Sequence, residues 1–143
     1  MKQKVLAVDP GEKRIGLAIS DELGVIANPV KVLQHVSRDR DAQEIVKLAK
    51  EKGAGKIIIG CSYDEDNQLT PQGRKAKKLA DTIRGMGFSE VELWDEFGST
   101  KTAQFTRREM GVKRSKRKGH LDELAATIIL QSYLDESRNK WKP

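Results

Sequence analysis

One segment near the N-terminus constrains the fold of this chain more than any other. Apolar residues, several of them β-branched, run from Val5 to Val8 and stop at Asp9; a Pro-Gly turn follows, and a second apolar run begins at Ile15. Apolar runs separated by turn residues are typical of a β-hairpin. We therefore predict two antiparallel strands with a carboxylate at the rim of the hairpin.

Asp9 has two interpretations on this pattern. A carboxylate at the end of a buried strand is held rigidly and stays open to a ligand, which suits catalysis or metal binding. Asp-Pro-Gly is also ordinary turn chemistry, so Asp9 could equally well serve only to open the turn. The hairpin alone leaves both interpretations open.

The hydrophobic pattern predicts three further strands. A third strand extends from Val25 to Val36, with an irregularity at Asn28-Pro29. Residues 56–60 form a continuous apolar run between turn signals, as in a strand covered on both faces. Residues 91–96 form the fifth strand and end in two acids. Three consecutive antiparallel strands are thus followed by α/β order.

Helical periodicity separates and follows these later strands. It is found over residues 39–52, 71–85 and 121–135, and Ser99 can cap a further helix that reaches about Met110. A chain of 143 residues is long enough for one domain with a real core and too short for two ordinary ones. We predict a single α/β domain over residues 1–136 and a C-terminal tail over 137–143.

The composition favours a soluble protein of the cytoplasm. Charged residues make up 34% of the chain, and no run approaches the roughly 20 apolar residues of a membrane span. Residues 1–4 lead straight into a strand without a signal-like segment, so we expect no membrane association. The single cysteine, Cys61, excludes an internal disulfide and disfavours a thiolate zinc site. We expect Cys61 to be a small buried residue near a strand end.

The formal net charge of +6 is concentrated in one segment, residues 107–118. Its basic residues are Arg107, Arg108, Lys113, Arg114, Lys116, Arg117 and Lys118. Against the single acid Glu109 they account for the whole excess, because the other 131 residues hold 20 basic and 20 acidic side chains. Such a cluster favours contact with the phosphates of a polyanion, although a solvated loop without a partner would look the same. We predict that this segment, with Lys13 and Arg14 of the hairpin, binds nucleic acid.

Four acids lie at strand ends or at the start of a helix, and these ends could meet at one edge of the sheet. Parallel strands bring their ends to one edge of a sheet, so Asp9 would meet Asp95 or Glu96 if the first and fifth strands were neighbours. Asp122, in the first turn of the last helix, would be the third carboxylate. Individually these acids could be turn residues or partners of a helix dipole.

Three carboxylates this close would repel one another unless a divalent cation neutralised them. Oxygen ligands favour Mg²⁺ or Mn²⁺. Two such ions about 4 Å apart could activate water and stabilise the leaving oxygen of a phosphodiester. The acids together therefore predict metal-dependent phosphodiester hydrolysis.

Three segments carry a resemblance to a known family. They are Val8-Asp9-Pro10-Gly11 with Arg14-Ile15-Gly16-Leu17-Ala18, Trp94-Asp95-Glu96 followed by Ser99-Thr100 and Ala103, and Lys118-Gly119-His120-Leu121-Asp122 leading into Ala125-Ala126 and Ile129-Leu130. In this order and spacing the chain resembles the YqgF/RuvX family of RuvC-like nucleases with a ribonuclease H fold. The resemblance covers nearly the whole chain.

The resemblance implies a five-stranded mixed sheet, three antiparallel strands first, flanked by helices. Asp9, one acid of the Asp95-Glu96 pair, and Asp122 would form the metal-binding catalytic triad. The family implies nuclease action on structured nucleic acid, either processing of the pre-16S rRNA end or resolution of Holliday junctions. Junction cutting would call for a homodimer that places two sites on opposed strands, whereas trimming an RNA end would not.

Two positions depart from the family pattern. Phe97-Gly98 stands where an arginine usually follows the Asp-Glu pair, and Gly60-Cys61-Ser62 stands where Gly-Leu-Pro is usual. The missing arginine keeps open an alternative, a non-catalytic nucleic-acid or ribosome-associated module with a degenerate site. Phosphate-loop chemistry of the sugar-kinase and actin type is disfavoured because the chain has no residues for a second lobe.

Strand alternation does not decide which acid of the pair binds metal. It places Asp95 on the face of Leu93 and Glu96 on the face of Trp94, and either face could point to the metal.

Overall fold

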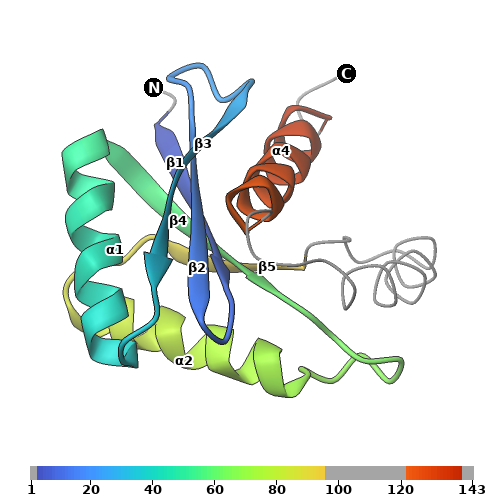
Figure 1. The fold of residues 1–143 in the computed structure, drawn as a ribbon. Helices are drawn as coiled ribbons and strands as arrows, with labels where there is room; N and C mark the ends of the chain where they lie inside the picture. Colours follow the sequence, from blue (N-terminus) through green and yellow to red (C-terminus); the bar gives the residue numbers. More distant parts are fainter. Residues whose placement is uncertain (1–2, 96–121, 140–143) are drawn as a thin grey trace.

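A computed structural model of the chain describes residues 3–95 and 122–139, with side chains from residue 124 to 137 in the second range. The described residues form one five-stranded sheet with helices on both faces (Figure 1). The strands are β1 (Lys4–Pro10), β2 (Arg14–Ser20), β3 (Ala27–Gln34), β4 (Ala54–Cys61) and β5 (Val91–Asp95). Their order in the sheet is β3-β2-β1-β4-β5.

The strand directions confirm the predicted mixed sheet. β2 is antiparallel to β1 and to β3, whereas β4 is parallel to β1 and β5 is parallel to β4. β3 is shorter than predicted and lies at an edge of the sheet, where a proline is tolerated. The predicted irregularity is confirmed, because the register shifts between the pairs Leu17 with Lys31 and Ala18 with Pro29.

The condition under which Asp9 would meet Asp95 or Glu96 directly is not met, because β1 and β5 are not neighbours. β1 pairs with β2 on one side and with β4 on the other, and β5 pairs with β4. Both edges of β1 are therefore occupied before the chain reaches β5. β5 can add only to the outer edge of β4, about 10 Å from β1 at the usual spacing of strands.

The described helices are α1 (Arg38–Lys52), α2 (Pro71–Gly85) and α4 (Asp122–Asn139). The first turns of α1 and α2 are capped by side chains, with the Ser37 hydroxyl accepting from Arg40 N at 3.2 Å and the Thr70 hydroxyl from Gly73 N at 3.0 Å. α1 ends at Gly53, whose φ of 74° lies in the left-handed region. α4 continues beyond the predicted end near Asp135. The predicted helix from Ser99 to Met110 lies outside the described residues.

The sheet separates two hydrophobic clusters. α1 and α2 cover one face, and α4 covers the other (Figure 1). Side chains alternate along β1, so Leu6 and Val8 pack under α1 and α2 whereas Val5 and Ala7 pack under α4. Residues that pack toward α1 and α2 are said below to lie on the α1/α2 face, and the others on the α4 face.

Candidate active site

Asp9 is the buried acid at the end of the central strand. Its side chain is 7% exposed, and it is the last residue but one of β1. Because Val8 belongs to the α1/α2 face, alternation directs Asp9 to the α4 face. The hairpin pattern alone left Asp9 open between a turn residue and a site residue, and the structure places it within β1 rather than in an exposed turn.

Glycines flank Asp9 on both neighbouring strands. Gly16 of β2 is its direct partner, and Gly60 of β4 follows Ile59, the partner of Val8. A Cβ at Gly60 would lie 2.8 Å from Ile129 Cδ1 of α4, which shows that this position is also on the α4 face. Glycines thus take the positions beside Asp9 on both neighbouring strands, and Asp9 itself is engaged in interactions.

Trp94, near the end of β5, continues the row of α4-face positions that Asp9 and Gly60 occupy. Gly60 pairs with Trp94, whose indole Nε1 donates to Ser132 Oγ of α4 at 3.0 Å. Trp94 also packs edge-on against Tyr133, with 5.1 Å between ring centroids. Trp94 is thus on the α4 face, two strands away from Asp9.

A basic side chain borders this aromatic pair. Lys56 Nζ lies 2.6 Å from Glu92 Oε2 and 5.1 Å from the centroid of the Tyr133 ring. Burial lowers the pKa of Lys56, but hydrogen bonds to Glu92 and Tyr133 outweigh it, so the pKa is raised above its ordinary value of 10.5. These contacts hold β4, β5 and α4 together beside the start of β5.

Asp95 lies on the other face of the sheet from Asp9. It ends β5 and pairs with Cys61, which is 2% exposed and packs on the α1/α2 face. The prediction of a buried Cys61 at a strand end is confirmed. Asp95 itself is half-buried and engaged in interactions. Strand alternation therefore assigns Asp9 and Asp95 to opposite faces of the sheet.

The other predicted site residues are only partly described. Asp122 is the first residue of α4, but its side chain lies outside the described part, as do Glu96 and the basic segment 107–118. Among the described residues, no group of three or more His, Cys, Asp or Glu side chains could hold a metal. α4 ends at the same end of the molecule as the N-terminus, so its first turn points toward the other end, where β1 stops (Figure 1).

Lys13 and Arg14 lie at the turn that follows Asp9. Gly11 N donates to Arg14 O at 2.9 Å and closes the turn, while His35 N donates to Lys13 O at 2.9 Å. A Cβ at Gly11 would lie 2.5 Å from Arg14 O, so the turn needs a glycine there. The Lys13 side chain is exposed.

Sequence reasoning missed a cavity on the α1/α2 side of the same turn. The cavity has a volume of about 340 Å³ and lies between the β1–β2 turn, the start of α1 and the first half of α2. Its polar lining includes Glu12, His35, Ser37, Arg38, Lys75 and Lys78. The basic outer face of α2 could have indicated it, but nothing in the sequence places His35 next to α2.

The five-stranded mixed sheet with helices on both faces is a ribonuclease H-like fold. The chain has the fold of RuvC from Thermus thermophilus, solved with a Holliday junction, with a TM-score of 0.56 at 13% identity over 95% of this chain and 96% of that one. It also has the fold of the fowlpox virus Holliday junction resolvase, with a TM-score of 0.52 at 14% identity over 93% and 99% of the two chains.

The family is shown by sequence. Residues 3–136 match the model of the RuvX family, described as Holliday junction resolvase, and the chain belongs to this family. A relative from Clostridioides difficile is 39% identical over 92% of this chain and 94% of its own, and one from Thermoanaerobacter pseudethanolicus is 36% identical over 96% and 99%. Each is named "Putative pre-16S rRNA nuclease".

No helix within residues 3–95 and 122–139 has the length and hydropathy that a membrane crossing requires.

Proposed function

We propose that this chain is a divalent-metal-dependent endonuclease that hydrolyses phosphodiester bonds in structured nucleic acid, in the cytoplasm. The observation that carries the proposal is Asp9, a buried carboxylate at the end of the central strand with glycines on both sides. The family supports the reaction class. The substrates named for its relatives and fold neighbours are pre-16S rRNA and the Holliday junction.

We assign Asp9 and Asp122 to the metal. Asp9 points to the face that α4 covers, and Asp122 begins α4. Carboxylate oxygens are ligands that suit Mg²⁺ or Mn²⁺. Bound there, such ions would supply an activated water and stabilisation of the leaving oxygen.

The third ligand in this proposal is Glu96 rather than Asp95. Trp94 is on the α4 face and Asp95 on the other, so one more step of the same alternation would return Glu96 to the face of Asp9. Asp9, Glu96 and Asp122 would then hold the divalent metal, which would supply an activated water and stabilise the leaving oxygen.

Cleavage by the purified full chain tests the proposal. A labelled four-way DNA junction and a precursor 16S rRNA fragment are incubated with Mg²⁺, Mn²⁺ or EDTA. We expect single-turnover cleavage of at least one substrate only with metal. Asp9→Asn should lower the rate by at least about 100-fold and leave binding unchanged, since it removes a metal ligand and keeps the shape.

Matched variants test the assignment within the acid pair. Glu96→Gln should lose cleavage as Asp9→Asn does, whereas Asp95→Asn should keep most of it. If Asp95→Asn lost cleavage and Glu96→Gln kept it, the choice of Glu96 would be contradicted, but the proposal of a nuclease would stand. Undiminished cleavage by Asp9→Asn would overturn the proposed site.

The substrate test also separates the alternatives for the biological role. Symmetric cutting of the junction, together with a homodimer in solution, would favour resolution. Cleavage of the precursor RNA by a monomer would favour rRNA processing. Binding without cleavage under either metal, equal in the parent and Asp9→Asn, would identify a non-catalytic nucleic-acid module and refute the enzyme.

Contacts with the nucleic acid are assigned to two groups of cations. Lys13 and Arg14 lie at the turn next to Asp9, and the segment 107–118 supplies the largest excess of positive charge in the chain. Phosphates release counterions to such clusters, so binding should weaken as salt rises.

A further inference from the structure

We propose that the cavity between the β1–β2 turn, α1 and α2 binds the phosphodiester backbone of the nucleic acid outside the active site. The inference rests on the proposed function, since it concerns the same substrate. The cavity lies on the α1/α2 face of the sheet, whereas Asp9 points to the α4 face. It would therefore form a second contact near the same end of β1, on the opposite face of the sheet.

The charges that line the cavity favour an anion. Its cations are Arg38, Lys75 and Lys78, and its acids are Glu12 and Asp41. Among the residues that the structure describes, no acidic side chain forms an ion pair with any of these three cations. They are therefore available to a ligand.

The acid Asp41 is already engaged inside the protein. Its side chain is 6% exposed and contacts His35 Nδ1, and its Oδ1 accepts from Val36 N at 3.1 Å. These bonds hold the connection between β3 and α1 in place and use the carboxylate oxygens. Glu12 is then the only lining acid, among the described residues, with an exposed side chain.

The sequence of α2 is difficult to explain without an anionic partner. Its first eight residues contain Arg74, Lys75, Lys77 and Lys78 and no acid. Cations in the N-terminal part of a helix oppose its dipole, and like charges three or four residues apart repel by a few tenths of a kcal/mol. Bound phosphates would relieve both effects.

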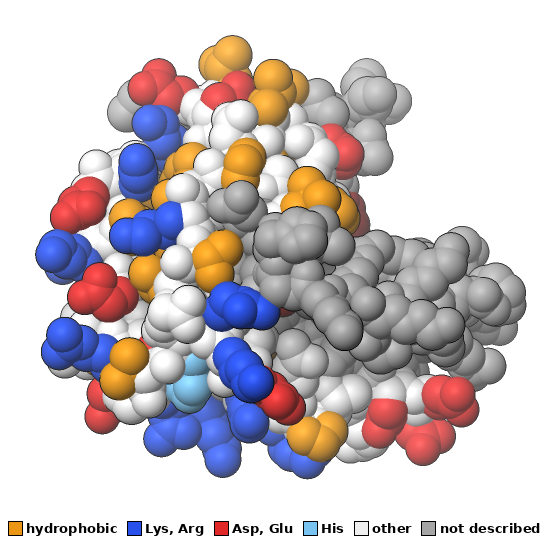
Figure 2. Space-filling model, viewed as in Figure 1, with side chains coloured by type: hydrophobic (Ala, Val, Ile, Leu, Met, Phe, Trp, Pro, Cys, Tyr) orange, Lys and Arg blue, Asp and Glu red, His pale blue; other side chains and the backbone are white. Residues whose placement is uncertain are grey.

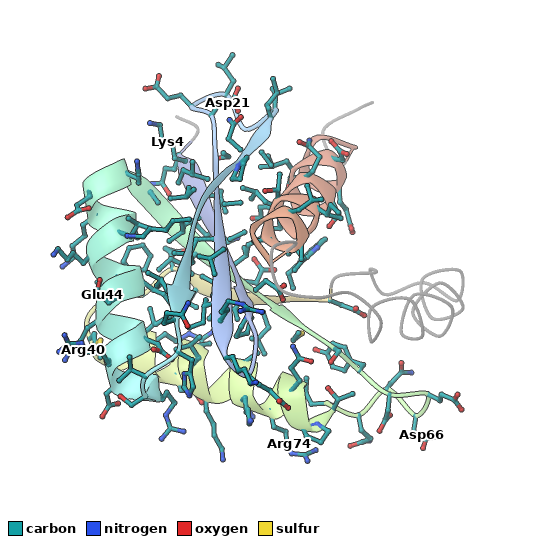
Figure 3. The ribbon with its side chains drawn as sticks, viewed as in Figure 1. Lys4, Asp21, Arg40, Glu44, Asp66 and Arg74 are labelled. Carbon is teal, nitrogen blue, oxygen red and sulfur yellow. The ribbon has the colours of Figure 1, made fainter. Side chains whose placement is uncertain are left out.

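The arrangement of these cations favours a polymer over a small ligand. Lys and Arg side chains gather along the lower edge of the molecule, below the start of α1 and along α2 (Figure 2). Arg74, near the start of α2 (Figure 3), is exposed and does not line the cavity, and its guanidinium donates to Leu69 O at 2.9 Å. A row of exposed cations that continues past a cavity suits a phosphate backbone, which carries one charge about every 3.4 Å along each strand.

The cavity is fixed relative to Asp9. Pro10 lines the cavity and directly follows Asp9 in β1. Gln72 Nε2 of α2 donates to Pro10 O at 3.0 Å, which ties the start of α2 to the turn. A strand of nucleic acid held at Asp9 can therefore continue around the turn onto α2.

The test compares two double variants of the full chain. Lys75→Ala/Lys78→Ala removes two exposed charges at the cavity, and Lys47→Ala/Lys50→Ala removes two exposed charges from α1 away from it. Alanine favours helix, so both variants should fold, and circular dichroism checks this. Binding of the labelled RNA fragment and of the junction is measured by anisotropy in EDTA over a range of salt concentrations.

We expect the slope of log K against log salt to become shallower by about 2 for the cavity variant, one for each lost phosphate contact, and to change little for the control. Amide signals of residues 35–38 and 75–78 should shift when the RNA fragment is added to the ¹⁵N-labelled parent. Equal slopes for the two variants, or shifts absent from both segments, would overturn the inference.

The two proposals fail separately in this design. Binding is measured without metal, so a chain that never cleaves can still show the effect of Lys75 and Lys78. Conversely, if the parent cleaved with metal and Lys75→Ala/Lys78→Ala bound nucleic acid as the parent does, the proposal of a nuclease would stand and that of a second contact would fail.

Discussion

At the scale of single residues, the site depends on glycines as much as on acids. Gly16 and Gly60 lie beside Asp9 in the two neighbouring strands, and Gly60 also lets Ile129 of α4 approach the sheet. Glycine inside a strand often marks such a close approach. The sequence shows both glycines, but only the pairing of the strands reveals that they flank the same carboxylate.

A substitution at Gly60 tests this packing. Gly60→Ala should destabilise the protein by about 1–3 kcal/mol, because its Cβ would meet Ile129 Cδ1 at 2.8 Å. Ile129→Val removes that atom at a cost of about 0.5–1.5 kcal/mol by itself. The double variant should lose less free energy of unfolding, as measured with urea, than the sum of the losses in the two single variants. Strict additivity would contradict the proposed contact.

At the scale of elements, turns and caps hold the sheet at the end remote from the site. Asp21 lies at the β2–β3 turn, far from Arg74 at the lower end (Figure 3). Its Oδ1 accepts from Val25 N at 2.7 Å and from Ile26 N at 3.2 Å. Gln131 of α4 also binds the backbone that follows this turn: it donates to Val25 O at 2.8 Å and accepts from Ala27 N at 2.9 Å.

The turn should respond to pH in a defined direction. Hydrogen bonds from Val25 N and Ile26 N lower the pKa of Asp21 below its ordinary value of 3.8. The charged carboxylate therefore stabilises the fold above about pH 5, and this contribution disappears as pH falls through the lowered pKa. Asp21→Ala should be less stable than the parent at pH 7, and the difference should vanish in acid.

Urea midpoints measured from pH 7 down to pH 2 check this expectation. Glu22→Ala is the control, because it removes one negative charge from the same turn without removing those hydrogen bonds. A difference between the parent and Asp21→Ala that stays constant down to pH 2 would show that the charge of Asp21 contributes nothing.

At the scale of the whole molecule, α4 completes the second hydrophobic cluster. Val5, Ala7, Ala18 and Ile58 of the sheet are buried together with Ala126, Ile129, Leu130 and Leu134 of α4. Without α4 this face of the sheet would be exposed to water. The last residues of the chain thus cover the strands formed by the first.

Two truncations test this dependence and the proposed domain boundary. A chain ending at residue 121 should lack a cooperative thermal transition and bind a hydrophobic dye, because it loses all of α4. A chain ending at residue 136 should retain cooperative unfolding, with a loss of about 1 kcal/mol or less, because it keeps Leu134. Cooperative unfolding of the shorter chain would contradict the role of α4.

How much could be predicted differs between the fold and the site. Strand directions, helix positions and the burial of Cys61 follow from local pattern, because hydrophobic period and turn residues act over a few neighbours. Whether β1 and β5 are neighbours could not be predicted, because pairing between distant strands leaves no local signal. The cavity was missed for the same reason, since His35 and Lys75 come from separate elements.

The sequence by itself determined the order of strands and helices, the excess charge of residues 107–118 and the acids that could bind metal. These follow from residue types and spacing along the chain. Only the tertiary structure decided that β4 separates β1 from β5 and that Asp9 and Asp95 lie on opposite faces. The physical reason is that strand pairing and alternation set which side chains share a face, and both depend on contacts between segments far apart in sequence.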